Sequence, residues 1–404
     1  MGIPPRPHPL ARSQRVDQAN RFFAHAWDKG WLPPPLLDAD ALWESAAKPL
    51  ADNAKAAEEA GRPPDDVVDF RERLSHLVNA VGSEANLNPL GRVMAHGQLE
   101  RVIRNRLRMG AVWLDRPGMP ETNIAPPIII VGHMRSGTTR IHKLLAADPA
   151  HSSTRYCDAF HPVPGKIVDL REWKASFEIG FLSALNPWLQ SIHPIASTEV
   201  EEELGWLAGA LQHSIYESQW HIPSYSAWSE PRDASPVYRE FARVLKTDAA
   251  HRGLAEKPRV LKVPVFSENL PELLEQFPDV RLLVAERDLE AVHRSAVSLV
   301  ANQMAVQSDA CDLPEIEGQW HRKIKLREDR RKAFLKDWHG PVSHLHFDEL
   351  NTDWEGTISR AYRELDMPLT DRAKQAMRRV MARSKSGQHR SHSEQLRGFH
   401  SPAN

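Results

Sequence analysis

The chain has 404 residues, of which 52 are basic and 53 are acidic, so its formal net charge is −1. Balanced charge gives no global positive field to hold a polyanion, and we therefore expect no nucleic-acid partner. The content of 41% hydrophobic and 26% charged residues is typical of a soluble globular protein, and two isolated cysteines exclude a disulfide framework and a cysteine zinc site.

The first seven residues are rich in proline and lack the apolar core that a secretory signal needs. No run of about 18 apolar residues occurs in the sequence, so we expect no transmembrane segment and a cytoplasmic location. The 20 histidines include no His-Glu-x-x-His or comparable ligand spacing. We therefore expect no metal site.

Residues 15–116 are predicted to be mostly helical. Apolar residues recur at helical spacing within 39–48 and within 66–81, and each set forms one stripe. Prolines crowd the chain directly after this segment and cannot continue a helix. We therefore predict a helical N-terminal extension over residues 1–120 and a second domain over residues 121–404.

The second domain opens with a strand, a turn and a helix. An apolar run at 128–131 precedes the turn GHMRSGTT at 132–139, and apolar residues at helical spacing follow. The NH groups of such a turn and the positive end of the helix dipole form an anion site. Its two glycines have Walker spacing, but Thr138 and Thr139 stand at the lysine and Ser/Thr positions, and the nearest cation is Arg135.

This turn resembles the 5′-phosphosulfate-binding loop of sulfotransferases that use 3′-phosphoadenosine 5′-phosphosulfate (PAPS), particularly the bacterial group with a helical N-terminal extension. The resemblance implies an α/β fold, in which a P-loop-like parallel sheet is flanked by helices and preceded by an all-helical extension. It also implies that the 5′-phosphosulfate is bound by Arg135, Ser136, Gly137, Thr138 and Thr139.

A second motif lies further along the chain, where two apolar strands at 258–264 and 280–288 enclose a helix and are followed by another. Arg287 at the end of the second strand and Ser295, eight residues later, resemble the 3′-phosphate-binding element of the same family. An arginine supplies charge and a serine a hydroxyl, as a phosphate requires. Lys262 corresponds to a family lysine near the transferred sulfuryl group, where it would stabilise charge on the leaving oxygen.

The resemblance does not supply a general base, because the residues just after Lys262 lack the histidine that related sequences often carry there. Glu202 is the first substitute, since it lies about where the bacterial group carries an acidic pair. We expect it in the first turn of a helix, on one face with Glu199 and Glu203. His133, within the phosphate loop, is the second substitute.

Three further segments have two interpretations each. Arg155 and His161, in a predicted irregular loop at 151–165, are either acceptor-site residues or solvated loop residues. The basic segment at 383–392 is either a disordered tail or a loop that closes over the nucleotide. An aromatic cluster either lines an acceptor pocket or belongs to ordinary packing, and it comprises Tyr216, Trp220, Tyr225 and Trp228.

Together the motifs predict an enzyme, a PAPS-dependent sulfotransferase that acts on a hydroxyl or amine of a small-molecule, lipid or carbohydrate acceptor. PAPS is the expected co-substrate, and no metal is required. One alternative is a P-loop kinase or nucleotide triphosphatase, against which the absent Walker lysine argues. The other is a nucleotide-binding protein without turnover, which the missing histidine leaves open. The sequence identifies neither the acceptor nor the oligomeric state.

Overall fold

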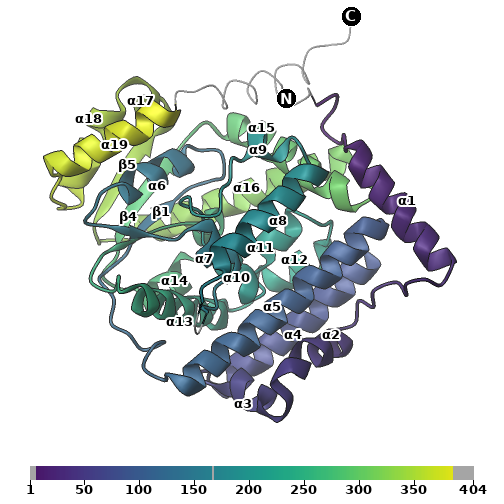
Figure 1. Cartoon of the computed structure of the whole chain (residues 1–404). Helices are drawn as coiled ribbons and strands as arrows, with labels where there is room; N and C mark the ends of the chain where they lie inside the picture. Colours follow the sequence, from purple (N-terminus) through teal and green to yellow (C-terminus); the bar gives the residue numbers. More distant parts are fainter. Residues whose placement is uncertain (1–5, 166–167, 385–404) are drawn as a thin grey trace, which may run out of the picture.

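The computed structural model describes residues 6–165 and 168–384. Its centre is a five-stranded sheet in the order β2-β3-β1-β4-β5, in which every neighbouring pair is parallel (Figure 1). The strands are β1 (Ile128–Val131), β2 (Ser152–Ser153), β3 (Arg259–Lys262), β4 (Arg281–Glu286) and β5 (Val342–His346). Because all strands run the same way, their carboxyl ends meet at one edge.

Helices cover both faces of the sheet. All four residues of β1 are buried, as expected for a central parallel strand. Ile129 and Val131 pack on one face against α13 (Ser235–Arg252) and α14 (Leu270–Gln276). Ile128 and Ile130 pack on the other face, against the helices α6 (Thr138–Ala146), α18 (Trp354–Glu364) and α19 (Asp371–Ser384). The predicted P-loop-like sheet flanked by helices is confirmed.

The N-terminal part is helical, as predicted, and lies on one side of the molecule in purple and blue (Figure 1). Its elements are α1 (Gln14–Asp28), α2 (Ala39–Ala47), η1 (Lys48–Asn53), α3 (Ala54–Glu59), α4 (Pro64–Ser83) and α5 (Pro89–Asp115). Asn88 caps α5 by accepting a hydrogen bond from the NH of Gly91 over 2.7 Å. Since α4 and α5 share a core with residues 208–225, the boundary near residue 120 stays a prediction.

The remaining elements lie between and after the strands. They are α7 (Tyr156–Phe160), α8 (Arg171–Leu185), α9 (Leu189–Ile192), α10 (Leu204–Gly209), α11 (His213–Glu217), α12 (Pro223–Ser229), η2 (Pro264–Glu268), α15 (Leu289–Gln307), α16 (Leu313–Lys336) and α17 (Phe347–Thr352). The predicted irregular loop at 151–165 is wrong in part, because it contains the edge strand β2 and the short helix α7.

The expected helix start in the acidic run at 199–203 is also wrong. Val200 pairs with Arg155 in an isolated antiparallel bridge, and the NH of Glu201 donates to the carbonyl of Thr154 over 3.0 Å. These bonds hold the run in an extended conformation, and α10 begins only at Leu204. The acidic side chains therefore do not share a helix face.

Within the described ranges, no helix is both long and apolar enough to cross a membrane. Residues 385–392 of the basic segment lie outside the described residues, so the prediction of a closing loop there stays a prediction.

Candidate active site at the carboxyl ends of the strands

The phosphate loop joins β1 to α6 through two closely packed glycines. A Cβ on Gly132 would lie 2.8 Å from the carbonyl oxygen of Ala285, and a Cβ on Gly137 would lie 2.9 Å from the ring of Phe347. Arg135 and Gly137 adopt left-handed φ values of 68° and 85°. Left-handed residues directly before a helix are typical of backbone nests that bind anions.

Two guanidinium groups meet beside this loop. Arg135 Nε donates to Ser295 Oγ on α15 over 2.8 Å, and Arg287, directly after β4, donates to the backbone carbonyl of Arg135. Neither guanidinium has a carboxylate oxygen within 4.0 Å in the part of the chain that the structure describes. Burial and the charge of Arg287 lower the pKa of Arg135 to about 10. The loop is therefore bordered by two guanidiniums that no carboxylate of the described residues contacts directly.

Lys262 brings a third cation to the same edge. Its side chain is 2% exposed, and its Nζ contacts Glu202 Oε1 directly and donates to Thr139 Oγ1 over 3.3 Å. Because β3 pairs with β1, the end of β3 lies beside the start of α6. The structure thus brings together the predicted lysine, the first candidate base and a residue of the phosphate loop.

The carboxyls next to Glu202 have opposite environments. Glu203 is fully buried, and this burial raises its pKa to about 7, although Oε2 accepts a hydrogen bond from the NH of Lys262 over 2.9 Å. Burial also penalises the charge of Glu201, but His193, whose Nε2 lies 3.3 Å from Oε1, reverses the effect and lowers its pKa to about 2.

The His193–Glu201 pair was not predicted from the sequence. Burial lowers the pKa of His193, but the charges of Glu201 and Glu202 and the bond to Glu201 outweigh it, so the pKa lies above its ordinary value. A histidine eight residues from a glutamate has no recognisable local pattern. The bridge between Val200 and Arg155 is what brings the pair to the site.

Residues 126–371, more than half of the chain, match a family model that is described as "Sulfotransferase family". The chain belongs to the sulfotransferase family. Among solved structures, it is similar to sulfotransferase STF1 from Mycobacterium tuberculosis H37Rv, with 26% identity and a TM-score of 0.71 over 89% of this chain and 98% of that one. Sulfotransferase STF9 from Mycobacterium avium, at 23% identity and a TM-score of 0.75 over 86% of this chain and 88% of that one, shows the fold alone.

Curated relatives are the omega-hydroxy-beta-dihydromenaquinone-9 sulfotransferases Stf3 of Mycobacterium bovis and Mycobacterium tuberculosis. Each is 27% identical over 259 residues, which are 61% of this chain and 64% of the relative. The matched region therefore spans slightly less than two thirds of the length of these relatives.

The second candidate base, His133, contacts α16 from within the phosphate loop. His133 is buried, and its Nε2 is 2.9 Å from Glu328 Oε2 on α16. Burial lowers its pKa, although Glu328 opposes the shift. The contacts of His133 thus attach the phosphate loop to α16, whereas Glu202 contacts the lysine of the site.

The predicted acceptor residues are engaged in other contacts. Arg155 pairs with Asp158 and Glu172, and His161 Nε2 lies 3.1 Å from Glu178. The aromatic cluster belongs mainly to the core formed with α2, α4 and α5, where Tyr216, Trp220 and Tyr225 are buried and Trp228 packs at the edge. These rings therefore serve packing.

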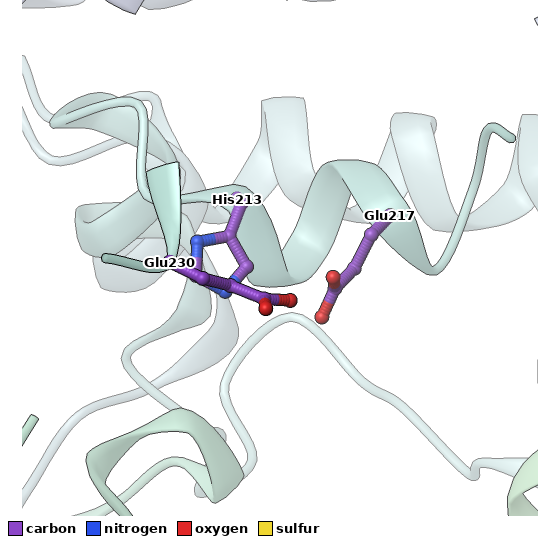
Figure 2. Close-up of side chains that lie close together, drawn as sticks. All are labelled: His213, Glu217 and Glu230. Carbon is purple, nitrogen blue, oxygen red and sulfur yellow. The ribbon is translucent and has the colours of Figure 1, made fainter. Parts of the chain in front are cut away.

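A buried charged group on α11, α16, η2 and the end of α12 has the composition of a metal site. His213, Glu217 and Glu230 point toward one another in Figure 2, with ligand atoms within 4.8 Å. Lys323 Nζ, however, lies 3.1 Å from His213 Nε2 and 3.0 Å from Glu217 Oε2, and also contacts Glu230. Its ammonium group supplies the cation that these carboxylates need. The closed network, as we call this group, comprises His213, Glu217, Glu230, Glu268, Lys323 and Arg327.

Proposed function

We propose that this protein transfers a sulfuryl group from PAPS to a hydroxyl or amine of an acceptor. The observation that carries this proposal is that Arg135 and Arg287, which no described carboxylate contacts, lie beside a left-handed loop at a helix N-terminus. Several anionic groups on one nucleotide, the 5′-phosphosulfate and the 3′-phosphate, suit such a site. The sulfotransferase family generally uses PAPS as its sulfuryl donor.

The residues divide the donor between two subsites in this proposal. The loop from Arg135 to Thr139 holds the 5′-phosphosulfate through backbone NH groups and hydroxyls. Arg287 and Ser295 hold the 3′-phosphate, and the bond between Arg135 and Ser295 joins the two subsites. Small displacements in one subsite therefore pass to the other.

Transfer requires that the bond between sulfur and the bridging oxygen breaks, that sulfur bonds to the acceptor oxygen or nitrogen, and that the acceptor loses a proton. Lys262 stabilises the negative charge that develops on the bridging oxygen. Glu202 accepts the proton. Their contact is the reason for assigning both roles to one place, since it sets the base beside the transferred group. His193, held by Glu201, is the other basic group of this segment.

The acceptor that we propose is a lipid hydroxyl. The Stf3 relatives are named for an omega-hydroxylated dihydromenaquinone, a lipid-like quinone. The sequence-based alternatives, a small molecule or a carbohydrate, would change the acceptor and leave the donor site as proposed.

Calorimetric titration with 3′-phosphoadenosine 5′-phosphate, the donor product, tests the proposal. We expect binding that weakens at least about tenfold, or roughly 1.4 kcal/mol, in Arg287→Ala. Arg378→Ala is the control, because Arg378 is 57% exposed and pairs with Glu355 away from the loop. Absence of binding, or a preference for ATP with Mg²⁺, would contradict the sulfotransferase function and favour the kinase or triphosphatase alternative.

A further inference from the structure

Helix α8 carries an apolar stripe on its outer face. Leu170, Trp173, Phe177 and Phe181 follow at spacings of three and four residues, which places them on one side of a helix. Their exposed fractions are 51%, 68%, 69% and 49%, respectively. The rings of Trp173 and Phe177 are stacked, with centroids 6.1 Å apart. Exposed aromatic residues in a continuous row are unusual on a soluble surface.

The opposite face of α8 already serves the fold. Ala175 and Ile179 are buried against Tyr156 and Cys157 of α7. The stripe is therefore not needed to attach the helix, and none of the described elements covers it. Figure 1 shows α8 in teal near the front of the molecule.

The segment that carries the stripe also reaches the candidate active site. Ser176 Oγ on α8 donates to Ser197 Oγ over 2.9 Å, just before the acidic run. Helix α9 follows α8, and Arg135 of the phosphate loop donates to the carbonyl of Ile192 at its end over 3.0 Å. The stripe therefore lies on a segment that contacts the phosphate loop and leads into the acidic run with Glu202.

Charge along α8 is matched except at one position. Glu172 pairs with Arg155, and Glu178 pairs with Arg101. Lys174, exposed beside the stripe, has no carboxylate within 4.0 Å among the residues described. This face thus offers aromatic rings and one free ammonium group, which suits a surface with apolar chains and anionic headgroups.

The exposed area favours a lipid surface over a second protein chain. The three rings together expose on the order of 400 Å², since an aromatic side chain offers about 150–250 Å² in full. A stable protein interface buries about 800 Å² on each partner.

We propose that the α8 stripe docks this protein on the surface of an anionic bilayer, so that the active site receives an acceptor whose apolar part stays in the membrane. The acceptor part of this inference rests on the proposed function. The aromatic rings enter the boundary between headgroups and acyl chains, and Lys174 contacts the headgroups.

Co-sedimentation of the full chain with vesicles of phosphatidylcholine and phosphatidylglycerol tests the docking surface. We expect Trp173→Ser/Phe177→Ser to weaken vesicle binding at least tenfold. The matched control is Phe22→Ser/Trp31→Ser on and after α1, where the rings are 57% and 65% exposed, and we expect it to bind as the wild type does. Lys174→Glu should weaken binding to the anionic vesicles and leave binding to pure phosphatidylcholine unchanged.

Titration of each variant with 3′-phosphoadenosine 5′-phosphate shows that the fold and the donor site are intact. Vesicle binding without bisphosphate binding in the wild type would overturn the proposed function and leave the docking surface supported. Wild type that does not sediment with vesicles would overturn the docking inference, as would equal loss in both double variants. A dimer that dissociates on substitution of Trp173 and Phe177 would assign the stripe to a second copy instead.

Discussion

The closed network and the phosphate loop differ in how their charges are matched. In the closed network, Lys323 and Arg327 are only 1% exposed in their side chains, and each pairs with two or more carboxylates. At the phosphate loop, Arg135 and Arg287 lie close together, and among the described residues their hydrogen bonds go to backbone and hydroxyl oxygens. Both groups are rich in arginine and lysine, yet only one retains positive charge.

This difference separates a structural group from a binding site. Burying a charge is costly unless an opposite charge lies beside it, so a buried network without a ligand is expected to be neutral. A group that keeps two guanidiniums without a carboxylate is instead suited to an anion from outside. Lys262 lies between the two cases, because Glu202 matches its charge at the edge of the site.

The largest effect is expected in the closed network. Lys323→Met leaves Glu217, Glu230 and Glu268 with too little positive charge, and we expect the free energy of unfolding to fall by about 3–5 kcal/mol. Urea unfolding measures this free energy. Arg322→Met is the control, because Arg322 also pairs with Glu230 but is 52% exposed, and its loss should cost under about 1 kcal/mol. Similar losses of unfolding free energy in both variants would show that burial does not determine how much each cation contributes to stability.

Substitution of Glu202, the candidate base that pairs with Lys262, tests its role in the transfer. Glu202→Gln keeps the shape of the side chain but cannot accept a proton, so we expect kcat to fall about 100-fold, or roughly 2.7 kcal/mol. The affinity for 3′-phosphoadenosine 5′-phosphate should stay within about threefold. Steady-state sulfation of a long-chain primary alcohol measures the rate. Glu199→Gln is the control, since Glu199 is exposed and lies 3.8 Å from Lys143; an equal loss there would contradict the role of Glu202.

The pH dependence of stability distinguishes an unmatched carboxyl from a matched one. The pKa of Glu203 is raised from 4.5 to about 7, so its protonated form favours folding. This contribution is fully present below about pH 4.5 and is lost as the pH rises through 7. Glu203→Gln should therefore be more stable than the wild type by about 3 kcal/mol at pH 8 and about equally stable near pH 4.5. Thermal unfolding across this range measures the difference, and parallel curves would contradict it.

Glu240 is the matched counterpart. Burial would raise its pKa, but the charges of Arg62 and Arg106 lower it to about 2. Its contribution to stability is thus present above about pH 4.5 and is lost as the pH falls toward 2. Glu240→Gln should therefore be less stable than the wild type above about pH 4.5, and thermal unfolding should show this deficit shrinking as the pH falls toward 2. At pH 8 the slope of the free energy of unfolding against pH should be the same in this variant and in the wild type. A different slope there would contradict the assignment of Glu240 as a matched carboxyl.

The smallest effect on stability is expected at the phosphate loop. Arg135→Met removes one of two like charges that repel, and this offsets the lost bonds to Ser295 and Ile192, so the free energy of unfolding should change by less than about 1 kcal/mol. The affinity for 3′-phosphoadenosine 5′-phosphate should nevertheless fall about tenfold, or roughly 1.4 kcal/mol. A stability loss as large as that of Lys323→Met would remove the distinction between the two groups.

Local features of the fold could be predicted from the sequence. The strand at 128–131 and the helix at 138–146 follow from a buried β-branched run, two glycines and helical spacing, all within 20 residues. Arg287 and Ser295 likewise lie on adjacent elements, and their resemblance to the 3′-phosphate-binding element of the family predicted a shared site. These patterns are local, because hydrogen bonds within one turn or one helix decide them.

The tertiary structure alone decided which distant residues meet. Glu202 contacts Lys262 across 60 positions because β3 pairs with β1 and the acidic run is held extended along Thr154 and Arg155. Helical propensity at 199–203 was overridden by these backbone bonds. Matching of charges was also invisible in the sequence, since Arg287 and Arg327 are the same residue type. Only their neighbours, brought close by folding, make one a candidate anion site and the other part of a network of paired charges.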